Sequence, residues 1–501
     1  MSLATVYSRA QNGMHSLPIT IEIHLANGLP GFTVVGLPEA AVRESKDRVR
    51  AAIQNAGFTF PNKRITVSLA PADVPKEGSR FDLGIAVGIL VASGQMNADL
   101  LTDHEFIGEL ALSGEIRPVR GILPTALACS NDKHRLILPA DNENEAALVQ
   151  SLTAYKARHL LDIFAHTQQD TALPQVSYQS NHYRQETLLD FADIKGQEHA
   201  KRILLIAAAG GHNVLMLGSP GTGKSMLASR MPTILPEMTE TEALETASIY
   251  SISHHGFNPQ QWGKRPFRQP HHSASSPALV GGGSNPKPGE ISLAHNGVLF
   301  LDELPEFSRQ VLEVLREPLE NDHIAISRAT KQMEYPANFQ LIAAMNPCPC
   351  GYLGDDEKPC TDTPDQIARY RNKISGPFID RIDIITEVPR IKHERLAEET
   401  KPEYCSDFMR EQVKKARNQQ MQRQGCANAN LPTAKINTFC ALNDSNTAML
   451  NQAAKALSLS MRSYHRIQKL ARTIADLDNA ASIGKNHLAE AIQLRRIEWS
   501  I

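Results

Sequence analysis

The sequence predicts an α/β protein built around a parallel sheet. An apolar run at 214–217 leads into a phosphate-loop pattern, G-x-x-x-x-G-K-[ST], with the residues Gly218, Ser219, Pro220, Gly221, Thr222, Gly223, Lys224 and Ser225. A second apolar run at 298–301 ends in Asp302 and Glu303. Strand-like and helix-like stretches also alternate through the first third of the chain, as they do in α/β folds.

Length and composition are those of a globular protein with several domains. The chain has 501 residues, of which 42% are hydrophobic and 21% charged, enough for about three domains. The net charge of −2 argues against a protein coated by polyanions, so any nucleic-acid contact requires a local patch or an inward-facing channel. The longest apolar stretch, 83–92, is too short for a membrane span, and we expect no membrane contact. Seven cysteines in a chain without a signal-peptide pattern predict a cytoplasmic location.

Residues 1–166 are predicted to form an N-terminal α/β domain. Alternating apolar and polar residues predict a half-buried strand over 19–25. A helix is expected over 38–54, a strand over 65–69 and an apolar helix over 82–92. The polar, irregular sequence that follows predicts an interdomain linker at 167–188.

The phosphate loop belongs to a second predicted domain, 189–390. Its glycines let successive backbone N–H groups converge on an anion. Lys224 is expected to reach the β- and γ-phosphates of ATP, and the Ser225 hydroxyl to bind Mg²⁺. A glycine-rich turn without this function would not explain the apolar strand directly before it.

Polar side chains follow two other predicted strands of this domain. Asp302 is expected to bind Mg²⁺ through water, and Glu303 to activate the attacking water as general base. The apolar run 341–345 ends at Asn346, whose amide is suited to orient that water. Two acids after a core strand are common by themselves, but beside a phosphate loop they indicate ATP hydrolysis.

Two basic stretches are candidates for DNA contact. The segment between the phosphate loop and Asp302 is longer than two βαβ units of ~30 residues need. It places Phe267 among basic side chains, which predicts either an exposed loop or a loop that contacts nucleic acid; these side chains are Lys264, Arg265, Arg268, His271 and His272. A hairpin is predicted over 324–339, with Arg328 and Lys331 at its tip.

Three arginines beyond the sheet are candidates for contact with nucleotide. Arg381 lies between acids at a turn, which by itself indicates a surface ion pair, but in an oligomeric ATPase it is a candidate arginine finger. The remaining sequence, 391–501, has a helical pattern, including a helix that begins near Ser460. Arg462 and Arg466 share one face of that helix, which is either solvated or near the nucleotide.

Taken together, these residues resemble AAA+ ATPases of the magnesium-chelatase-like branch, and more closely the ComM/YifB family. The resemblance covers nearly the whole chain and is most specific in RPFRQPHHSASSPALVGGGSNPKPGEISLAHNGVLFLDEL (265–304) and MNPCPCGYLGD (345–355). It implies a Lon-protease-like N-terminal domain of the ChlI type, an ATPase core and a C-terminal helical lid. It also implies a homo-hexameric ring that moves single-stranded and branched DNA. Its expected activity is branch migration during natural transformation, with recombination proteins as partners.

The resemblance assigns the nucleotide-site residues to named motifs. Lys224 and Ser225 match the Walker A motif, and Asp302 and Glu303 match the Walker B motif. Asn346 matches sensor 1.

The resemblance also assigns residues to the subunit interface and the pore. Arg381 matches the arginine finger, and Arg462 matches a second sensor that acts across the interface. The segment 264–272 matches an insertion in the second helix, and Arg328 and Lys331 fall in the hairpin before sensor 1. Both elements are expected to line a central pore.

The N-terminal region departs from Lon-type proteases at the catalytic positions. Arg80 stands where those proteases have the nucleophilic serine, and Ser79 is displaced from it by one position. The downstream segment 108–128 contains no lysine. Leu123 and Thr125 stand at the two candidate positions for the partner lysine of those proteases. Because a serine without a base is a poor nucleophile, we expect the fold without protease activity.

A cysteine-rich segment follows sensor 1 and departs from the two C-x-C pairs of related sequences. It supplies Cys348, Cys350 and Cys360, with Asp362 at the fourth position. These residues predict either a structural Zn²⁺ site, in which a carboxylate replaces one thiolate, or three thiols without metal.

The sequence favours an ATP-driven DNA motor over two other classes. A metal-chelatase accessory ATPase shares the same branch, but the additional N-terminal domain is not expected there. A protein-remodelling chaperone is the other alternative, because pore residues alone do not separate protein from DNA substrates.

Overall fold

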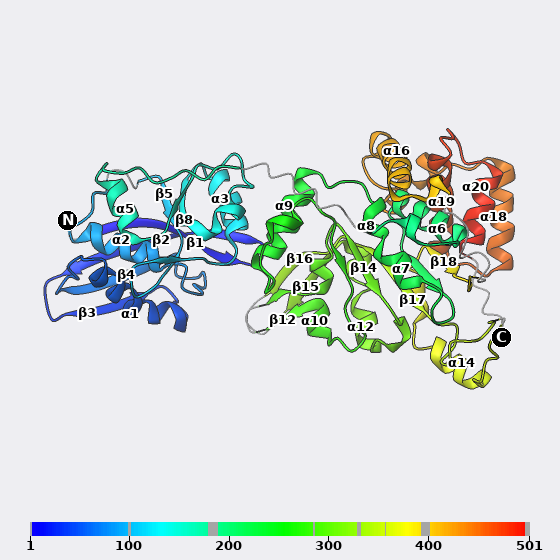
Figure 1. Cartoon of the computed structure of the whole chain (residues 1–501), viewed down its shortest axis with the longest axis horizontal. Helices are drawn as coiled ribbons and strands as arrows, with labels where there is room; N and C mark the ends of the chain where they lie inside the picture. Colours follow the sequence, from blue (N-terminus) through cyan, green and yellow to red (C-terminus); the bar gives the residue numbers. More distant parts are fainter. Residues whose placement is uncertain are drawn as a thin grey trace. The chain divides into compact units, whose positions relative to one another are not determined.

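The computed structural model describes residues 3–98, 102–178, 189–283, 286–327, 332–355, 357–391 and 401–495. The chain divides into two compact units (Figure 1). The first unit comprises Met1–Arg184, Ala243–Trp262 and Ala329–Tyr335, and the second comprises Gln185–Glu242, Gly263–Arg328 and Pro336–Ile501. None of the helices in these described ranges is both long and apolar enough to cross a membrane.

The first unit contains a mixed seven-stranded sheet. Its strands lie in the order β3 (Gly31–Val35), β4 (Arg64–Ala70), β2 (His15–Ala26), β1 (Leu3–Asn12), β5 (His104–Phe106), β8 (Arg135–Pro139) and β9 (Ala154–Ala157). β2 pairs antiparallel with β1 and β4, and the remaining neighbours are parallel. The alternation that predicts a strand over 19–25 is confirmed, because Ile19, Ile21 and Ile23 are fully buried.

Helices and a short hairpin complete this unit. They are α1 (Ala40–Asn55), α2 (Asp82–Ala92), α3 (Ile122–Asn131), α4 (Glu143–Ala146) and α5 (Leu160–Thr167), with β6 (Glu109–Leu110) pairing with β7 (Ile116–Arg117). The predicted apolar helix, α2, lies against β1 and β2. A Cβ atom at Gly84 or Gly88 would lie 2.7 Å from Ile21 Cδ1 or 2.1 Å from Ile23 Cδ1, so glycine permits this close packing.

A segment from much later in the sequence completes the core of the first unit. Ala243–Trp262 includes most of α9 (Glu240–Ile252) and the short helix η3 (Pro259–Gln261). Ala247 is buried in a cluster with Ile122 and Leu123 of α3. The Ser251 carbonyl accepts a hydrogen bond from the Gly121 backbone N–H at 3.1 Å, and the Ser251 hydroxyl donates to Glu145 Oε2 at 2.6 Å.

The second unit contains a five-stranded sheet whose strands are all parallel. Their order is β11 (Phe267–Arg268), β14 (Val298–Leu301), β17 (Gln340–Met345), β10 (Val214–Leu217) and β18 (Ile384–Glu387). β14 and β17 are completely buried, as expected for apolar runs inside a parallel sheet. Because all strands are parallel, the residues after β10, β14 and β17 meet at one edge of the sheet.

Shorter elements surround this sheet. They are α6 (Glu198–Gly210), α7 (Lys224–Ser229), α8 (Met231–Ile234), α10 (Ser276–Val280), α11 (Glu290–Leu293), α12 (Arg309–Val314), α13 (Pro318–Asn321), α14 (Pro364–Arg371), α15 (Gly376–Ile379), β12 (Gly281–Gly282) and β13 (Lys287–Pro288). Strands β15 (His323–Ser327), in this unit, and β16 (Gln332–Pro336), mostly in the first unit, occupy the segments where the sequence predicts a hairpin. Arg328 and Lys331, the predicted tip residues, lie outside the described residues.

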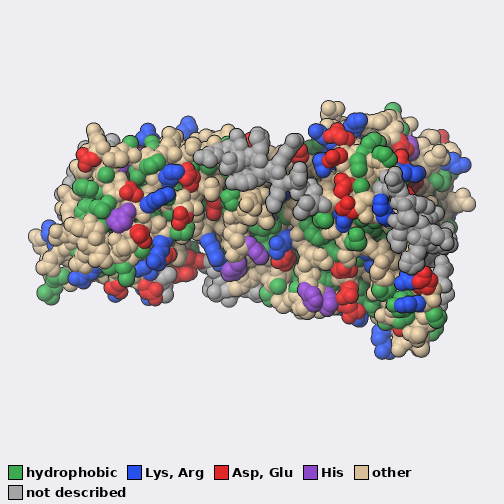
Figure 2. All heavy atoms as spheres, in the orientation of Figure 1, with side chains coloured by type: hydrophobic (Ala, Val, Ile, Leu, Met, Phe, Trp, Pro, Cys, Tyr) green, Lys and Arg blue, Asp and Glu red, His purple; other side chains and the backbone are tan. Residues whose placement is uncertain are grey.

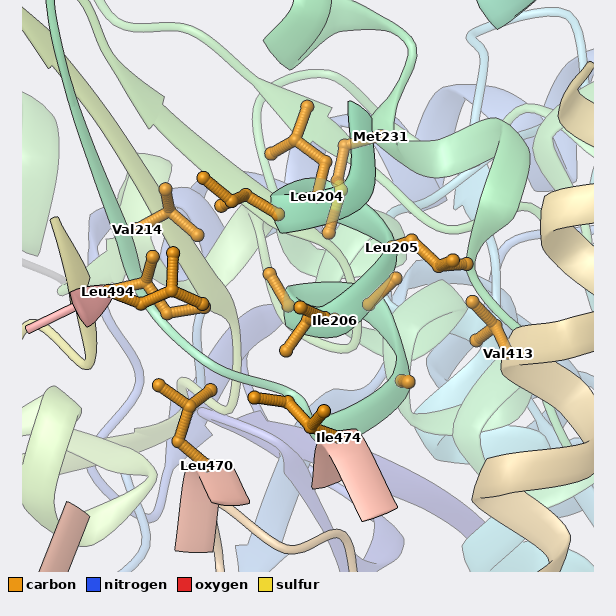
Figure 3. Packing of buried hydrophobic residues seen from close by; sticks show 14 of the residues in the cluster. Leu204, Leu205, Ile206, Val214, Met231, Val413, Leu470, Ile474 and Leu494 are labelled. Atoms are coloured by element: carbon orange, nitrogen blue, oxygen red, sulfur yellow. The ribbon is translucent and has the colours of Figure 1, made fainter. Parts of the chain in front are cut away.

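The C-terminal helices share a hydrophobic core with the parallel sheet. They are α16 (Ser406–Gln424), α17 (Thr433–Phe439), α18 (Asp444–Ala456), α19 (Met461–Leu477) and α20 (Lys485–Gln493). Figure 3 shows side chains of α6 packed with Val413 of α16 and with Leu470 and Ile474 of α19. The predicted helix and its apolar stripe are therefore confirmed, and burying that stripe attaches the lid to the sheet.

Candidate functional site

The phosphate loop lies between β10 and α7, as the motif predicts. Gly221 and Gly223 have φ angles of +79° and +92°, which glycine adopts without the cost that a Cβ atom imposes. The Lys224 ammonium group donates to the carbonyl oxygens of Gly218 and Ser219 at 2.7 and 3.0 Å, and to Asn346 Oδ1 at 3.3 Å. Burial lowers the pKa of Lys224, whereas the charges of Asp302 and Glu303 oppose that shift. The loop thus holds a partly desolvated cation beside the Asn346 amide.

The predicted Mg²⁺ ligands also meet at this edge. The Ser225 hydroxyl donates to Asp302 Oδ2 at 2.6 Å, although Ser225 lies in α7 and Asp302 directly follows β14. A hydroxyl and a carboxylate supply the hard oxygen ligands that Mg²⁺ prefers. The chemistry of this pair therefore fits a magnesium ion bound next to a nucleotide phosphate.

Glu303 adopts an unusual backbone conformation directly after Asp302. Its φ angle is +53°, which is uncommon for a residue other than glycine and often found at functional sites. Its carboxylate is about half exposed and lies 3.0 Å from Nδ1 of His272. The structure thus places His272, predicted from sequence as part of a DNA-contacting loop, against the predicted general base.

The other basic residues of that loop differ in their surroundings. Arg265 donates to the carbonyl oxygens of Pro236 and Asn296 and pairs with Glu242 at 3.2 Å. Arg268 forms a bidentate ion pair with Glu290, in which Nε and Nη2 each donate to one carboxylate oxygen at 2.6 Å. These two guanidinium groups stabilise the fold locally. Lys264 is half-buried, and His271 is exposed with Nδ1 2.7 Å from the Ser273 hydroxyl.

The two interface arginines predicted from the sequence meet at one carboxylate. Arg381 Nη2 lies 2.6 Å from Glu320 Oε1, and Arg462 Nη1 lies 3.2 Å from the same oxygen. The Arg381 side chain is only 5% exposed, whereas that of Arg462 is 62% exposed. Their ion-pair partner is therefore Glu320 of α13 and not an acid of the phosphate-loop edge.

Arg466, the alternative to Arg462, is held in a buried ion pair with Asp383. Burial alone raises the pKa of Asp383, but Arg466 and His212 hold that pKa well below its usual range. Asp383 also accepts a hydrogen bond from the Asn213 backbone N–H at 2.8 Å, beside the start of β10. Arg466 therefore connects the lid to the sheet, and Arg462 is the exposed arginine of the pair.

The three cysteines after sensor 1 form a compact cluster. The three distances between the sulfurs of Cys348, Cys350 and Cys360 are 3.4, 3.5 and 3.6 Å. Asp362 Oδ2 lies 3.8 Å from the Cys360 sulfur and accepts a hydrogen bond from the Cys350 backbone N–H at 2.7 Å. Four ligand atoms within 4.8 Å of one another fit the donor set of a single metal ion.

The segment that contains this cluster contacts the phosphate loop. A Cβ atom on Gly351 would lie 2.7 Å from Cδ of Pro220, so the two loops touch at this glycine. A hydrogen bond from the Ser219 side chain lowers the pKa of Asp355. The cysteine segment therefore supports one side of the nucleotide site. No local pattern in the sequence identifies Gly351 and Asp355 as site residues, because their role depends on a contact between separate loops.

The first unit brings Arg80, which stands at the expected serine position, next to Thr125, one of the two candidate positions for the partner lysine. The Arg80 guanidinium donates to the Thr125 hydroxyl at 3.1 Å, and burial lowers the pKa of Arg80 to about 10. Ser79 donates instead to Glu109. An arginine thus occupies the expected serine position, and neither candidate for the lysine position, Leu123 or Thr125, is a lysine.

Comparisons with known proteins cover all three parts of the chain. Family models match residues 21–142 (subunit ChlI of Mg-chelatase), 190–396 (magnesium chelatase, subunit ChlI) and 403–495 (magnesium chelatase, subunit ChlI C-terminal). The chain is 53% identical over 500 residues to the competence protein ComM of Haemophilus influenzae, covering 99% of this chain and 98% of the relative. It is 46% identical over 504 residues to the uncharacterized protein YifB of Escherichia coli, with coverages of 99% and 98%. A stretch of 65 residues is 43% identical to an archaeal Lon protease of Archaeoglobus fulgidus, covering 13% of this chain and 10% of the relative.

Proposed function

The chain belongs to the ComM/YifB family of magnesium-chelatase-like AAA+ proteins, and we propose that it is an ATP-driven motor that moves DNA as a homo-hexameric ring. The family implies the use of ATP and Mg²⁺. The observation that most supports the motor is the separation of the site into two parts. Lys224, Ser225, Asp302 and Asn346 meet at one sheet edge, while Arg381 and Arg462 share Glu320. Such a division suits hydrolysis between neighbouring subunits.

Each residue at the sheet edge has a role in this proposal. Lys224 binds the β- and γ-phosphates, and Ser225 and Asp302 hold Mg²⁺, which neutralises phosphate charge when bound. Glu303 accepts a proton from the attacking water, and Asn346 orients that water. Arg381 and Arg462 stabilise charge on the γ-phosphate of the next subunit.

The proposed DNA-contacting elements are those that the family resemblance implies. The loop around Lys264 and His271 and the hairpin with Arg328 and Lys331 line the pore and contact the strand. The domains predicted at 1–166, 189–390 and 391–501 act as the N-terminal domain, motor core and lid. The substrate is single-stranded or branched DNA, and the process is integration of incoming strands during transformation together with recombination proteins.

The Lys224→Ala variant tests the motor directly. Loss of the ammonium group should abolish both ATP turnover and displacement of a strand from forked or three-stranded DNA. Lys485→Ala, at an exposed lysine in the first turn of α20, is the matched control and should retain both activities. Strand displacement that persists without ATP turnover would overturn the proposal.

Stimulation of ATP turnover separates the motor from the two alternative functions. A DNA motor is stimulated by single-stranded or forked DNA, whereas a protein-remodelling ATPase is stimulated by an unfolded protein. A chelatase accessory would respond to a tetrapyrrole-inserting partner. Stimulation by unfolded protein alone would replace the DNA motor with a remodelling function.

We also propose that Cys348, Cys350, Cys360 and Asp362 bind one structural Zn²⁺. Three sulfurs and one carboxylate oxygen form a compact set of the size that a tetrahedral zinc site needs. The ion would hold the cysteine segment against the phosphate loop through Gly351 and Asp355.

Metal analysis of purified protein tests the zinc site independently of ATP turnover. The unmodified protein should contain one zinc ion per chain, and Cys360→Ser should lose it. Cys405→Ser, a half-buried cysteine outside the cluster, is the control and should keep it. Equal zinc content in both variants would show that the cluster is not the binding site.

A further inference from the structure

Glu320 of α13 is the shared partner of the two arginines that the proposed motor uses between subunits. Oε1 of Glu320 lies 2.6 Å from Nη2 of Arg381 and 3.2 Å from Nη1 of Arg462. Arg381 belongs to the turn after α15, whereas Arg462 lies in the first turn of α19 in the lid. One carboxylate oxygen therefore connects the ATPase core and the lid.

In this structure the Arg381 guanidinium is bound within its own chain and is not available to a neighbouring subunit. Its side chain is 5% exposed, and Nη1 donates to the Pro377 carbonyl at 2.6 Å. The second contact, to Glu320, is a charge-assisted hydrogen bond, which is stronger than a neutral one. Arg381 must give up this contact before its guanidinium can approach a phosphate on a neighbouring subunit.

The Glu320 carboxylate and the Arg462 guanidinium are both exposed to solvent. Glu320 is 41% exposed, and Arg462 is 62% exposed, so the Arg462 contact can form or break without opening a core. The two guanidinium groups carry like charges and compete for one oxygen. A closer contact between Arg462 and Glu320 weakens the hold on Arg381, and withdrawal of Arg462 strengthens it.

We propose that Glu320 is a positioning residue that retains Arg381 inside its own subunit until movement of the lid, through Arg462, allows Arg381 to be released. This inference rests on the proposed role of Arg381 as an arginine finger. It adds a specific control point, because the lid then sets when the neighbouring ATP can be hydrolysed. Glu320 does not contact the nucleotide in this mechanism and acts only through the two arginines.

The Glu320→Gln variant of the full-length protein tests the proposal. The neutral amide keeps the shape of the side chain but weakens its hold on Arg381, so basal ATP turnover at limiting protein concentration should rise about fivefold. The protein concentration that gives half-maximal turnover should fall. A gain of activity cannot come from damage to the fold, which makes this readout specific.

Two further variants serve as controls for Glu320→Gln. Glu317→Gln changes an exposed glutamate at the start of the same helix and should leave turnover unchanged. The double variant Glu320→Gln/Arg381→Ala should be as inactive as Arg381→Ala, because release acts through Arg381. Unchanged or reduced turnover in Glu320→Gln, with an unchanged melting temperature, would overturn the inference. Full turnover in Arg381→Ala would instead overturn the proposed arginine finger.

Discussion

Glu303 and Gly351 illustrate how single residues around the nucleotide site depend on backbone conformation. Both have positive φ angles, +53° for Glu303 and +87° for Gly351. Glu303 bears the conformational cost of a side chain at this angle, and its carboxylate contacts His272. Gly351 avoids that cost, and the absence of a side chain lets it touch Pro220.

Gly351→Ala should weaken ATP binding without unfolding the protein. A new Cβ atom would lie 2.7 Å from Pro220, so the cysteine segment or the phosphate loop must shift. We expect the KM for ATP to rise about tenfold, the effect of roughly 1.4 kcal/mol, with a smaller effect on kcat.

The control is Gly354→Ala, at a glycine with a similar φ angle of +80° but no atom near the added Cβ. Backbone strain alone would affect both variants equally. Steady-state ATPase kinetics should therefore show the rise in KM only for Gly351→Ala, and an equal rise in both would rule out the loop contact.

Protonation of the buried His104 ring is expected to destabilise the first unit at acidic pH. It is 3% exposed, and neither ring nitrogen has a hydrogen-bond partner among the described residues. Burial, followed by the nearby charges of Arg135 and His166, lowers the pKa of His104 to about 4 from an ordinary 6.5. The neutral ring is thus favoured in the folded state, so its stabilisation is complete above pH 6.5 and is lost as the pH falls towards 4. The loss should reach up to about 3 kcal/mol.

Hydrogen exchange of β5 and β8 amides, corrected for intrinsic rates, measures this pH dependence. The His104→Phe variant keeps an aromatic ring beside Tyr155 and His166, but that ring cannot be protonated. Its protection should change less between pH 6.5 and 4 than that of the unmodified protein. Identical pH profiles would exclude His104 as the titrating group.

At the level of elements, most of helix α9 belongs to the first unit, although it follows the start of the second unit in the sequence. Its residues from Ala243 onwards belong to the first unit, although the phosphate loop precedes them in sequence. Ala247 is buried beside α3, and Ser251 provides both backbone and side-chain hydrogen bonds. The first unit therefore requires a segment that lies outside the N-terminal third of the chain.

Ser251→Ala should destabilise the region around α3. It removes the hydroxyl that donates to Glu145, a carboxylate whose pKa is raised mainly by burial, and leaves that carboxylate with only its backbone donors at Ile122 and Leu123. We expect a cost of roughly 1–3 kcal/mol. Hydrogen exchange in residues 121–126 should accelerate accordingly.

Ser253→Ala provides the comparison for this element. Ser253 is also buried, but its hydroxyl bonds to the Tyr250 carbonyl within the same segment. Exchange in 121–126 should stay close to that of the unmodified protein. Equal acceleration in the two variants would indicate a general loss of helix stability, with no specific role for the Ser251 contact.

At the level of the whole molecule, charge is balanced, and the proposed motor depends on assembly of several subunits. Basic and acidic side chains are interspersed on the face shown in Figure 2, in keeping with the net charge of −2. A DNA-binding surface is therefore expected in a restricted region such as the proposed pore.

Mixing Arg381→Ala with unmodified protein tests whether sites are shared between subunits. If Arg381 completes the site of a neighbour, each variant subunit impairs a site that is otherwise intact, and a coordinated ring loses more activity than dilution predicts. ATP turnover should fall more steeply than the fraction of unmodified protein. Lys485→Ala mixed in the same way should leave turnover unchanged, and a linear decline with Arg381→Ala would indicate sites complete within one subunit.

The local features of this protein can be predicted from its amino-acid sequence: the phosphate loop, the buried strands before Asp302 and Asn346, and the apolar stripe of α19. Each of these follows from residues close together in the chain, whose spacing reflects the period of a helix or strand. Three contacts are visible only in the folded chain: Glu320 joins Arg381 to Arg462, His272 faces Glu303, and most of α9 completes the first unit. These contacts join residues separated by tens to hundreds of positions, and no local periodicity encodes which distant side chains packing will bring together.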